Sequence, residues 1–386
     1  MPLPPALSLS LFYLATFAVL GVYLPYLNLY FERIGLTGLQ IGIVSLITPL
    51  LGALAPTAGG VLADRLGRRR DLVVLSSVLA PIVFCLMLPA RTFGWIVLVL
   101  SLFAALRAPA LPLVEAKAME VVEAGGPAYG TMRAWGSLAF IAASLGAGPI
   151  VGRFGDGVML PILILLLALN GFAAVLLPSD APSVSRPALR PSLAGVMKGP
   201  GVGLFLAASV LSQASHGPYY VFYSITLKRA GYSPTAIGLL WALAVGCEVI
   251  AMWRMHRLLD RFGTLPTMGA CLLLGAVRWW ICASSTAPLM MAAAQALHAA
   301  SYAAYHVAAV THTHRVFGTD HRASGQAIFS SMTYGVGNVV GMLLSGLFYD
   351  RLSASFLFAG AASTSLAGGV LLALAARRGP GAARGL

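Results

Sequence analysis

The chain has 386 residues, of which 59% are hydrophobic and only 10% are charged. Because a soluble domain carries roughly 25% charged residues, this composition excludes an ordinary water-soluble globular protein, and the same hydrophobicity excludes intrinsic disorder. The net charge of +13 raises nucleic acid as a partner, but the positions of the cations point to membrane topology instead. We therefore expect a polytopic membrane protein that lies in a lipid bilayer and binds no nucleic acid.

Apolar runs long enough to cross a bilayer follow one another along the chain. A hydrocarbon core of about 30 Å takes about 20 helical residues. Pro109 and Pro112 in the fourth run, and Gly148 with Pro149 in the fifth, predict kinked helices. The fold class is expected to be all-α, with twelve transmembrane helices at approximately residues 6–31, 39–62, 72–89, 94–118, 132–151, 158–177, 201–227, 234–256, 265–284, 287–311, 323–347 and 354–376.

The distribution of cations sets the expected orientation. When the N-terminus is placed on the cytoplasmic side, most of the 25 Lys and Arg residues fall in cytoplasmic segments, for example Arg65, Arg186 and Arg377. This bias follows the positive-inside rule, so both termini are expected in the cytoplasm. The abundance of Ala, Leu, Gly and Arg, with little Lys, favours a bacterial protein of the cytoplasmic (inner) membrane.

Two sequence patterns repeat between the halves of the chain. Residues 33–42 align with residues 229–238, and the same offset aligns residues 64–67 with residues 260–263 without a gap. Such a duplication predicts an N-terminal six-helix bundle at residues 1–178, a cytoplasmic linker at 179–200 and a C-terminal six-helix bundle at 201–386. Paired bundles are typical of alternating-access transporters, which bind substrate between the bundles near the midplane.

The loop after the second apolar run carries a recognisable motif. The pattern Gly-x-x-x-Asp-Arg-x-Gly-Arg-Arg resembles the signature loop of the major facilitator superfamily, and its Asp-Arg-x-Gly core recurs in the second half. The resemblance implies twelve helices in two pseudo-symmetric bundles. We assign these loops to an inner gate, formed by Gly60, Asp64, Arg65, Gly67, Arg68, Asp260 and Arg261.

Ionisable residues also lie inside the expected spans, where charge is costly and usually marks a pathway or a proton relay. Arg107, near the middle of its helix, is expected to grip an anionic group through a forked guanidinium–carboxylate pair. Glu115 and Arg133 are expected to bind substrate, although they could instead neutralise each other as an interhelical pair. Burial favours the protonated form of a carboxylate, so Glu248 is expected to carry the coupling proton.

The remaining charges of the second half leave alternatives open. Arg278 could take part in proton coupling, or could hold Glu248 permanently ionised. His298 and His306 are eight positions apart, about two helical turns, so they are expected to share one face. His298 is assigned to coupling, and His306 either carries protons or makes a polar contact in the core.

A narrower resemblance rests on several of these positions. Residues 114–116 with 129–136, and Arg278 with His298, resemble the lactose permease, whose charges at matching positions hold substrate and proton. That permease has a proton-carrying Glu one turn after the His; here the residue is Ser301, so Glu248 or Glu115 would carry the proton. Residues 129–137 and 220–248 resemble the phenylpropionate permease family, which is related to the lactose and nucleoside proton symporters.

The aromatic residues have two interpretations. Trp135, Tyr220 and Tyr223 are expected to stack on a ring-bearing substrate, although tyrosines at these helix positions could also form an interfacial belt. Trp279 and Trp280 are expected to be lipid-facing anchors.

Several kinds of chemistry have no motif in this sequence. His312, His314 and His321 are expected in a cytoplasmic loop as a solvated basic end, so no metal site is predicted. No nucleotide fingerprint is present, so ATP is not expected as the energy source, and no cofactor beyond a coupling proton is expected. We expect no enzyme activity.

The sequence therefore predicts a monomeric secondary active transporter. It would take up a small organic substrate, such as an aromatic carboxylate, together with protons by alternating access. The alternative is a proton-driven antiporter that exports drugs or metabolites, since residues 148–152 partly match the antiporter signature. A non-transporting sensor or membrane enzyme would need a reactive nucleophile or metal cluster.

Overall fold

The computed structural model describes residues 3–180 and 194–378, without the side chains of residues 55–66, 194, 319, 320 and 323. The described residues form helices and turns and contain no strand, which confirms the predicted all-α class. Contacts divide the chain into two compact units: unit 1 comprises Met1–Arg186 with Ser224–Ala242, and unit 2 comprises Pro187–Tyr223 with Leu243–Leu386.

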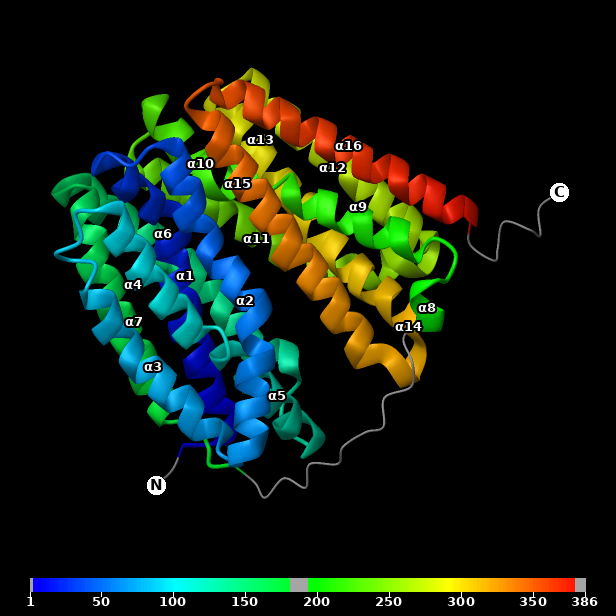
Figure 1. Cartoon of the computed structure of the whole chain (residues 1–386), viewed down its shortest axis with the longest axis horizontal. Coiled ribbons are helices and arrows are strands. Elements are labelled where there is room, and N and C mark those ends of the chain that lie inside the picture. Colours follow the sequence, from blue (N-terminus) through cyan, green and yellow to red (C-terminus); the bar gives the residue numbers. More distant parts are fainter. Residues whose placement is uncertain (1–2, 181–193, 379–386) are drawn as a thin grey trace. The chain divides into compact units, whose positions relative to one another are not determined.

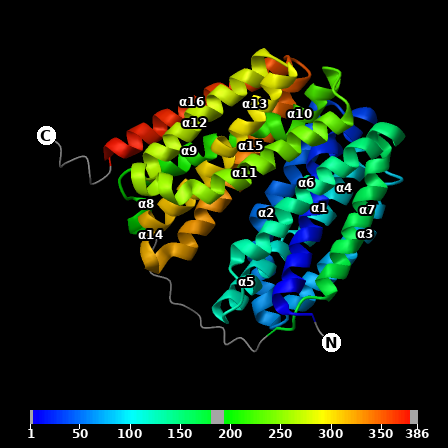
Figure 2. The same cartoon turned by 180° about the vertical axis from the view of Figure 1, so that it is seen from behind.

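Unit 1 is built mainly from the first half of the chain. In it α1 packs against α6 and α7, α3 packs against α7, and α2 packs against α4 (Figures 1 and 2). Its elements are α1 (Pro5–Arg33), α2 (Gly38–Leu66), α3 (Arg69–Cys85), α4 (Phe93–Arg107), α5 (Ala110–Glu123), α6 (Tyr129–Phe154), η1 (Asp156–Val158) and α7 (Met159–Val175).

Unit 2 contains most of the second half. In it α12 packs against α16 and α13, and α9 contacts both α16 and η3. Its elements are α8 (Ala194–Met197), α9 (Val202–Ala214), α12 (Thr264–Ser284), α13 (Pro288–His298), the π-helical turn η2 (Ala299–Ala304), α14 (Tyr305–Ser330), the π-helical turn η3 (Ser331–Gly337), α15 (Asn338–Tyr349) and α16 (Ala354–Arg378). The helices α10 (Gly217–Arg229) and α11 (Pro234–Phe262) are divided between the two units.

Eight helical stretches among the described residues are long and apolar enough to cross a membrane, so the chain is a multi-pass membrane protein. Every predicted apolar run contains helix. The count of twelve spans and the domain boundaries at 178 and 200 remain predictions. The contact-based units differ from those boundaries by the segment Ser224–Ala242, which clusters with unit 1.

Helix ends follow from local chemistry. The Thr37 side chain accepts a hydrogen bond from the Gln40 amide while the Gln40 side chain accepts one from Thr37, a capping box that begins α2. Gly67 ends α2 with a φ of 61°, a left-handed conformation that glycine adopts without a Cβ clash. The predicted break at Pro109 is confirmed, because α4 ends at Arg107 and α5 begins at Ala110.

One predicted loop is wrong. We expected residues 312–322 to connect two spans as a loop, but α14 runs from Tyr305 to Ser330 with a single non-helical residue, Gly318, at a φ of 63°. A glycine in this conformation changes the chain direction in one position, so no longer connection is needed. His312, His314 and His321 therefore belong to a helical segment.

Candidate functional site

A buried carboxylate–imidazole pair joins α11 to α13 in unit 2. Glu248 Oε1 lies 2.8 Å from His298 Nε2, and the two side chains are 14% and 5% exposed. The distance is that of a charge-assisted hydrogen bond, with the imidazole donating to the carboxylate. Two residues that the sequence assigned to proton coupling are thus in direct contact.

Arg278 on α12 is fully buried beside this pair but does not contact Glu248. Its guanidinium donates to the Ala294 carbonyl oxygen at 3.1 Å, to Ser301 Oγ at 3.2 Å and to Gln295 Oε1 at 3.3 Å. It also lies over the Tyr219 ring. In this arrangement neutral acceptors and an aromatic face hold the cation; whether its charge keeps Glu248 ionised stays an open alternative.

Aromatic rings surround two of the histidines of unit 2, His216 and His298. We call His216, Tyr219, Trp279, His298 and Tyr302 the imidazole cluster. Tyr302 stacks on His298 with ring centroids 5.3 Å apart, and Trp279 meets His216 edge to face at 5.0 Å. Trp279 is completely buried, so its prediction as a lipid-facing anchor is wrong. Its indole N–H donates to Ser215 Oγ, which fixes the ring inside the unit.

Each histidine of the imidazole cluster uses one ring nitrogen. His216 Nδ1 lies 2.9 Å from the Ser212 carbonyl oxygen, an acceptor, so Nδ1 carries the proton. His216 Nε2 and His298 Nδ1 are buried and have no hydrogen-bond partner among the described residues. Since buried polar atoms are nearly always paired, these two nitrogens are available to a proton, a water molecule or a solute.

Unit 1 holds its charges differently. Arg107, at the C-terminal end of α4, donates to Asn170 Oδ1 at 2.9 Å, and Asn170 donates in turn to Thr16 Oγ1 at 2.9 Å. This chain of hydrogen bonds links α4, α7 and α1. No described carboxylate lies within ion-pair distance of Arg107, so its positive charge is not neutralised by the protein there.

Arg133 and Glu115 do not form the direct ion pair that was one alternative. The Arg133 guanidinium lies 3.7 Å from the centre of the Phe17 ring, and the Tyr129 hydroxyl donates to Glu115 Oε1 at 3.3 Å. Tyr13 packs edge to face on Tyr129 and connects the two groups. Both ionisable side chains are half-buried and close in the fold.

The predicted aromatic contacts to substrate lie in different places. Tyr220 stacks on His216 and Tyr223 packs on Tyr219, both beside the imidazole cluster. Trp135 is 49% exposed on α6 and lines a shallow apolar hollow with Leu7. Arg133 does not line this hollow. Its role in substrate binding remains a prediction.

The predicted gate residues are only partly described. Gly60, Asp64 and Arg65 belong to the stretch 55–66, whose side chains the structure does not describe. Arg68 is exposed and lies 3.7 Å from Asp71. Asp260 and Arg261 are exposed near the C-terminal end of α11, where Arg261 lies over the Phe262 ring.

His306 has a partner of its own. His306 Nδ1 lies 2.6 Å from the Tyr334 hydroxyl on η3, while His298, on the other side of η2, pairs with Glu248. Six residues farther along α14, His312 Nδ1 lies 2.9 Å from Thr264 Oγ1. Among the described side chains, no group of three or more His, Cys, Asp or Glu could hold a metal ion.

Sequence reasoning missed the neutral partners of these charges. Asn170, Gln295 and Thr16 carry no charge, and the signal for Asn170 and Gln295 is that an amide side chain lies within a long apolar run. Ser301, noted only because it replaces a Glu, is a hydrogen-bond acceptor for Arg278. A search for every polar residue in an apolar run, charged or not, would have found Asn170 and Gln295.

Solved structures share this fold. The chain superposes on the crystal structure of nucleoside transporter NupG with a TM-score of 0.81, covering 96% of this chain and 99% of that chain at 17% identity. It superposes on the POT family transporter PepTSo with a TM-score of 0.73, covering 97% and 98% at 12% identity. These superpositions show that the chain has the same all-helical fold as these two proteins.

The sequence comparison is more specific. The family described as MFS_1 like matches residues 6–360, and the chain belongs to this family. It is 29% identical over 361 residues to the "Probable 3-phenylpropionic acid transporter" of Escherichia coli (strain K12), covering 89% of this chain and 91% of that protein. It is 24% identical over 372 residues to the "Maltose permease" of Geobacillus stearothermophilus, covering 95% and 94%.

Proposed function

We propose that this transporter takes up an aromatic carboxylate of the 3-phenylpropionate type together with a proton, by alternating access. The name of the Escherichia coli relative supports this substrate class. The observation that carries the proposal is that Arg107 and Arg133 have no carboxylate within ion-pair distance among the described side chains. A solute carboxylate supplies that missing charge.

The proton belongs on the Glu248–His298 pair in this proposal. An ionised Glu248 accepts the hydrogen bond from His298 Nε2. Binding of a proton to Glu248 removes its negative charge from an apolar site. This lowers the free-energy cost of the conformational change that turns the loaded site from one side of the membrane to the other. Arg278, held by neutral groups, stays cationic in both states.

The balance of charges sets the driving force. A carboxylate that moves with one proton transfers no net charge, so the membrane potential does not drive it. The pH gradient does, and one pH unit allows about tenfold accumulation. We further propose a monomer in a bacterial inner membrane, with both termini cytoplasmic, without ATP, metal or enzyme activity.

Labelled 3-phenylpropionate in proteoliposomes tests this function. With the outside acidic, the wild type accumulates the label above protein-free liposomes, which correct for permeation of the neutral acid. Glu248→Gln abolishes this accumulation but keeps exchange of external for internal label, because exchange moves loaded protein in both directions and needs no net proton transfer.

Glu123→Gln is the matched control, since Glu123 is exposed at the end of α5. It behaves as the wild type. If Glu248→Gln shows both normal accumulation and normal exchange, the proton assignment is wrong. If label leaves loaded vesicles against its gradient while the outside is more acidic than the inside, inward movement of protons drives its exit, and the protein is a proton antiporter.

A further inference from the structure

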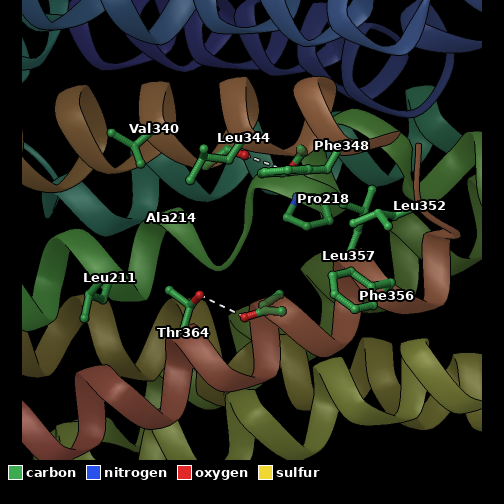
Figure 3. A pocket seen from close by; sticks show the side chains of 14 residues that line it. Leu211, Ala214, Pro218, Val340, Leu344, Phe348, Leu352, Phe356, Leu357 and Thr364 are labelled. Carbon is green, nitrogen blue, oxygen red and sulfur yellow. Dashed lines mark hydrogen bonds between the residues drawn. The ribbon is translucent and has the colours of Figure 1, made fainter. Parts of the chain in front are cut away.

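Unit 2 carries an apolar groove of about 330 Å³ along two membrane-spanning helices. Figure 3 shows Val340, Leu344 and Phe348 of α15 on one wall, and Leu357 and Phe356 of α16 on the other. Several of these side chains are well exposed, with Phe356 at 60%. The groove therefore opens to the surroundings of the unit and is not an internal packing defect.

Small residues create this space. Gly217 and Gly341 bring α10 and α15 so close that a Cβ on either would strike the backbone. Gly337 and Gly341 are spaced four residues apart, a spacing typical of glycines at close helix contacts. On the opposite wall, a Cβ on Gly360 would meet nothing within 4 Å, because it points into the open groove.

The groove offers almost no hydrogen-bonding capacity. Its two hydroxyl groups are used within their own helices: Ser345 Oγ donates to the Gly341 carbonyl oxygen at 2.6 Å, and Thr364 Oγ1 donates to the Gly360 carbonyl oxygen at 2.8 Å (Figure 3). The remaining walls are hydrocarbon. A polar solute would lose its hydration here without compensation, so the fitting occupant is an apolar chain.

The shape of the groove is long and narrow. The eight steps from Val340 to Phe348 span about 12 Å along α15 at 1.5 Å per residue. The groove ends at the turn between α15 and α16, where a second, shallow pocket shares Phe356 with it and is lined by Trp280, Ser284 and Ser353. The apolar groove thus leads to the turn between the two helices, where this second, mostly apolar pocket begins; we call this region the shelf.

Arg351 belongs to the same turn: it lies next to Leu352, which lines the groove, and two positions before Ser353, which lines the shelf. It is exposed and forms no ion pair with any residue that the structure describes. Trp280, 62% exposed, lines the shelf together with Ser353, as aromatic residues do at the bilayer–water boundary. A cation at a helix end is suited to a phosphate group.

We propose that the groove and shelf together bind one phospholipid, with an acyl chain between α15 and α16 and the phosphate at Arg351. This site lies within unit 2, does not involve Arg107, Glu248 or His298, and is independent of the transported substrate.

Native mass spectrometry of the purified full chain tests the proposal, with phosphatidylglycerol and phosphatidylethanolamine supplied as probes. The wild type keeps one phospholipid after extensive washing. Gly360→Phe fills the groove and lowers that retention at least tenfold. Arg351→Gln lowers it for both lipids, because the phosphate is common to them. Gly146→Phe keeps wild-type retention, since Gly146 is an exposed helical glycine with the same free space.

Equal retention by the wild type and Gly360→Phe overturns the proposal. So does a wild-type dimer that Gly360→Phe converts to a monomer, because the groove would then hold a second copy. If Gly360→Phe fails to fold, the wild type in lipid nanodiscs decides: density for an acyl chain along α15 supports the site, and an empty or protein-filled groove contradicts it.

Discussion

The two units treat their buried ions in opposite ways. In unit 2, Arg278 has three hydrogen-bond acceptors and an aromatic face, and Glu248 has an imidazole. In unit 1, Arg107 has one amide partner, and Arg133 lies on a phenyl ring. The charges of unit 2 are therefore held by hydrogen bonds from the protein. Among the described side chains, neither Arg107 nor Arg133 of unit 1 is in direct contact with a carboxylate, although Glu115 interacts electrostatically with Arg133.

This difference separates structural from ligand-binding charge. A buried ion whose partners are complete contributes to the folded state, and its loss leaves those partners unsatisfied. An ion with incomplete partners contributes less to folding and more to binding a solute of opposite charge. The comparison predicts that equivalent substitutions in the two units have different consequences.

Arg278→Met is expected to have the largest effect. It leaves the Ala294 carbonyl, the Gln295 amide oxygen and the Ser301 hydroxyl without their donor, and lowers the free energy of unfolding by about 3 kcal/mol or more. Thermal denaturation in detergent measures this as a lower Tm. Arg278→Lys keeps the charge and restores part of the lost free energy of unfolding. An unchanged Tm for Arg278→Met would contradict the proposed difference between the two units.

Arg107→Met is expected to lower the Tm by less than Arg278→Met, because it leaves only one buried acceptor, Asn170 Oδ1, without its donor. Its main expected effect is on binding. One charge-assisted contact to a carboxylate contributes about 1.5–3 kcal/mol, so the Kd for the proposed aromatic carboxylate rises roughly 10- to 100-fold. Calorimetric titration with the aromatic carboxylate measures this Kd. The comparison fails if Arg107→Met lowers the Tm as much as Arg278→Met while leaving the Kd unchanged.

Gly238→Ala probes the segment of the second half that clusters with unit 1. Ser144 Oγ donates to the Gly238 carbonyl oxygen, and a Cβ on Gly238 would strike the Tyr26 hydroxyl and the Ser144 backbone. Such overpacking destabilises by roughly 1–2 kcal/mol. Cysteine labelling at Thr235 should then accelerate, whereas the control Gly146→Ala, which meets no atom, should not change it.

Asp180→Asn is expected to have the smallest effect. Burial raises the pKa of Asp180, but hydrogen bonds from the Lys117 ammonium and the Arg70 amide outweigh it, so the pKa falls below its ordinary value of 3.8. The ionised form therefore stabilises the fold above pH 3.8, and this contribution is lost as the pH falls through the lowered pKa. The loss is below about 1 kcal/mol for a partly exposed pair.

The Tm measured against pH checks this prediction. The wild type should lose more stability than Asp180→Asn on acidification below pH 4. A parallel decline of both proteins would contradict it.

The positions of the helices were predictable because a span needs a long apolar run and because proline interrupts helices, as at Pro109. The candidate ions were also predictable, since charge inside such a run is rare. Their partners were not. Whether Arg133 meets Glu115 or Phe17, and whether Trp279 faces lipid or the imidazole cluster, depends on helix rotations of a few tens of degrees, which a sequence without clear polar and apolar faces does not specify.

The two π-helical turns, η2 and η3, decide how the loss or gain of one residue affects the helices around them. A π-turn holds one residue more than an α-turn; η2 stands between His298 and His306, and Tyr334 lies within η3. Deleting a single residue from a regular α-helix rotates everything beyond it by about 100°. Deleting one from Ala299–Ala304 would instead remove the extra residue of the π-turn and restore a regular helix, with His298 and His306 keeping nearly their present directions, so this stretch tolerates a change of length that the helices around it would not.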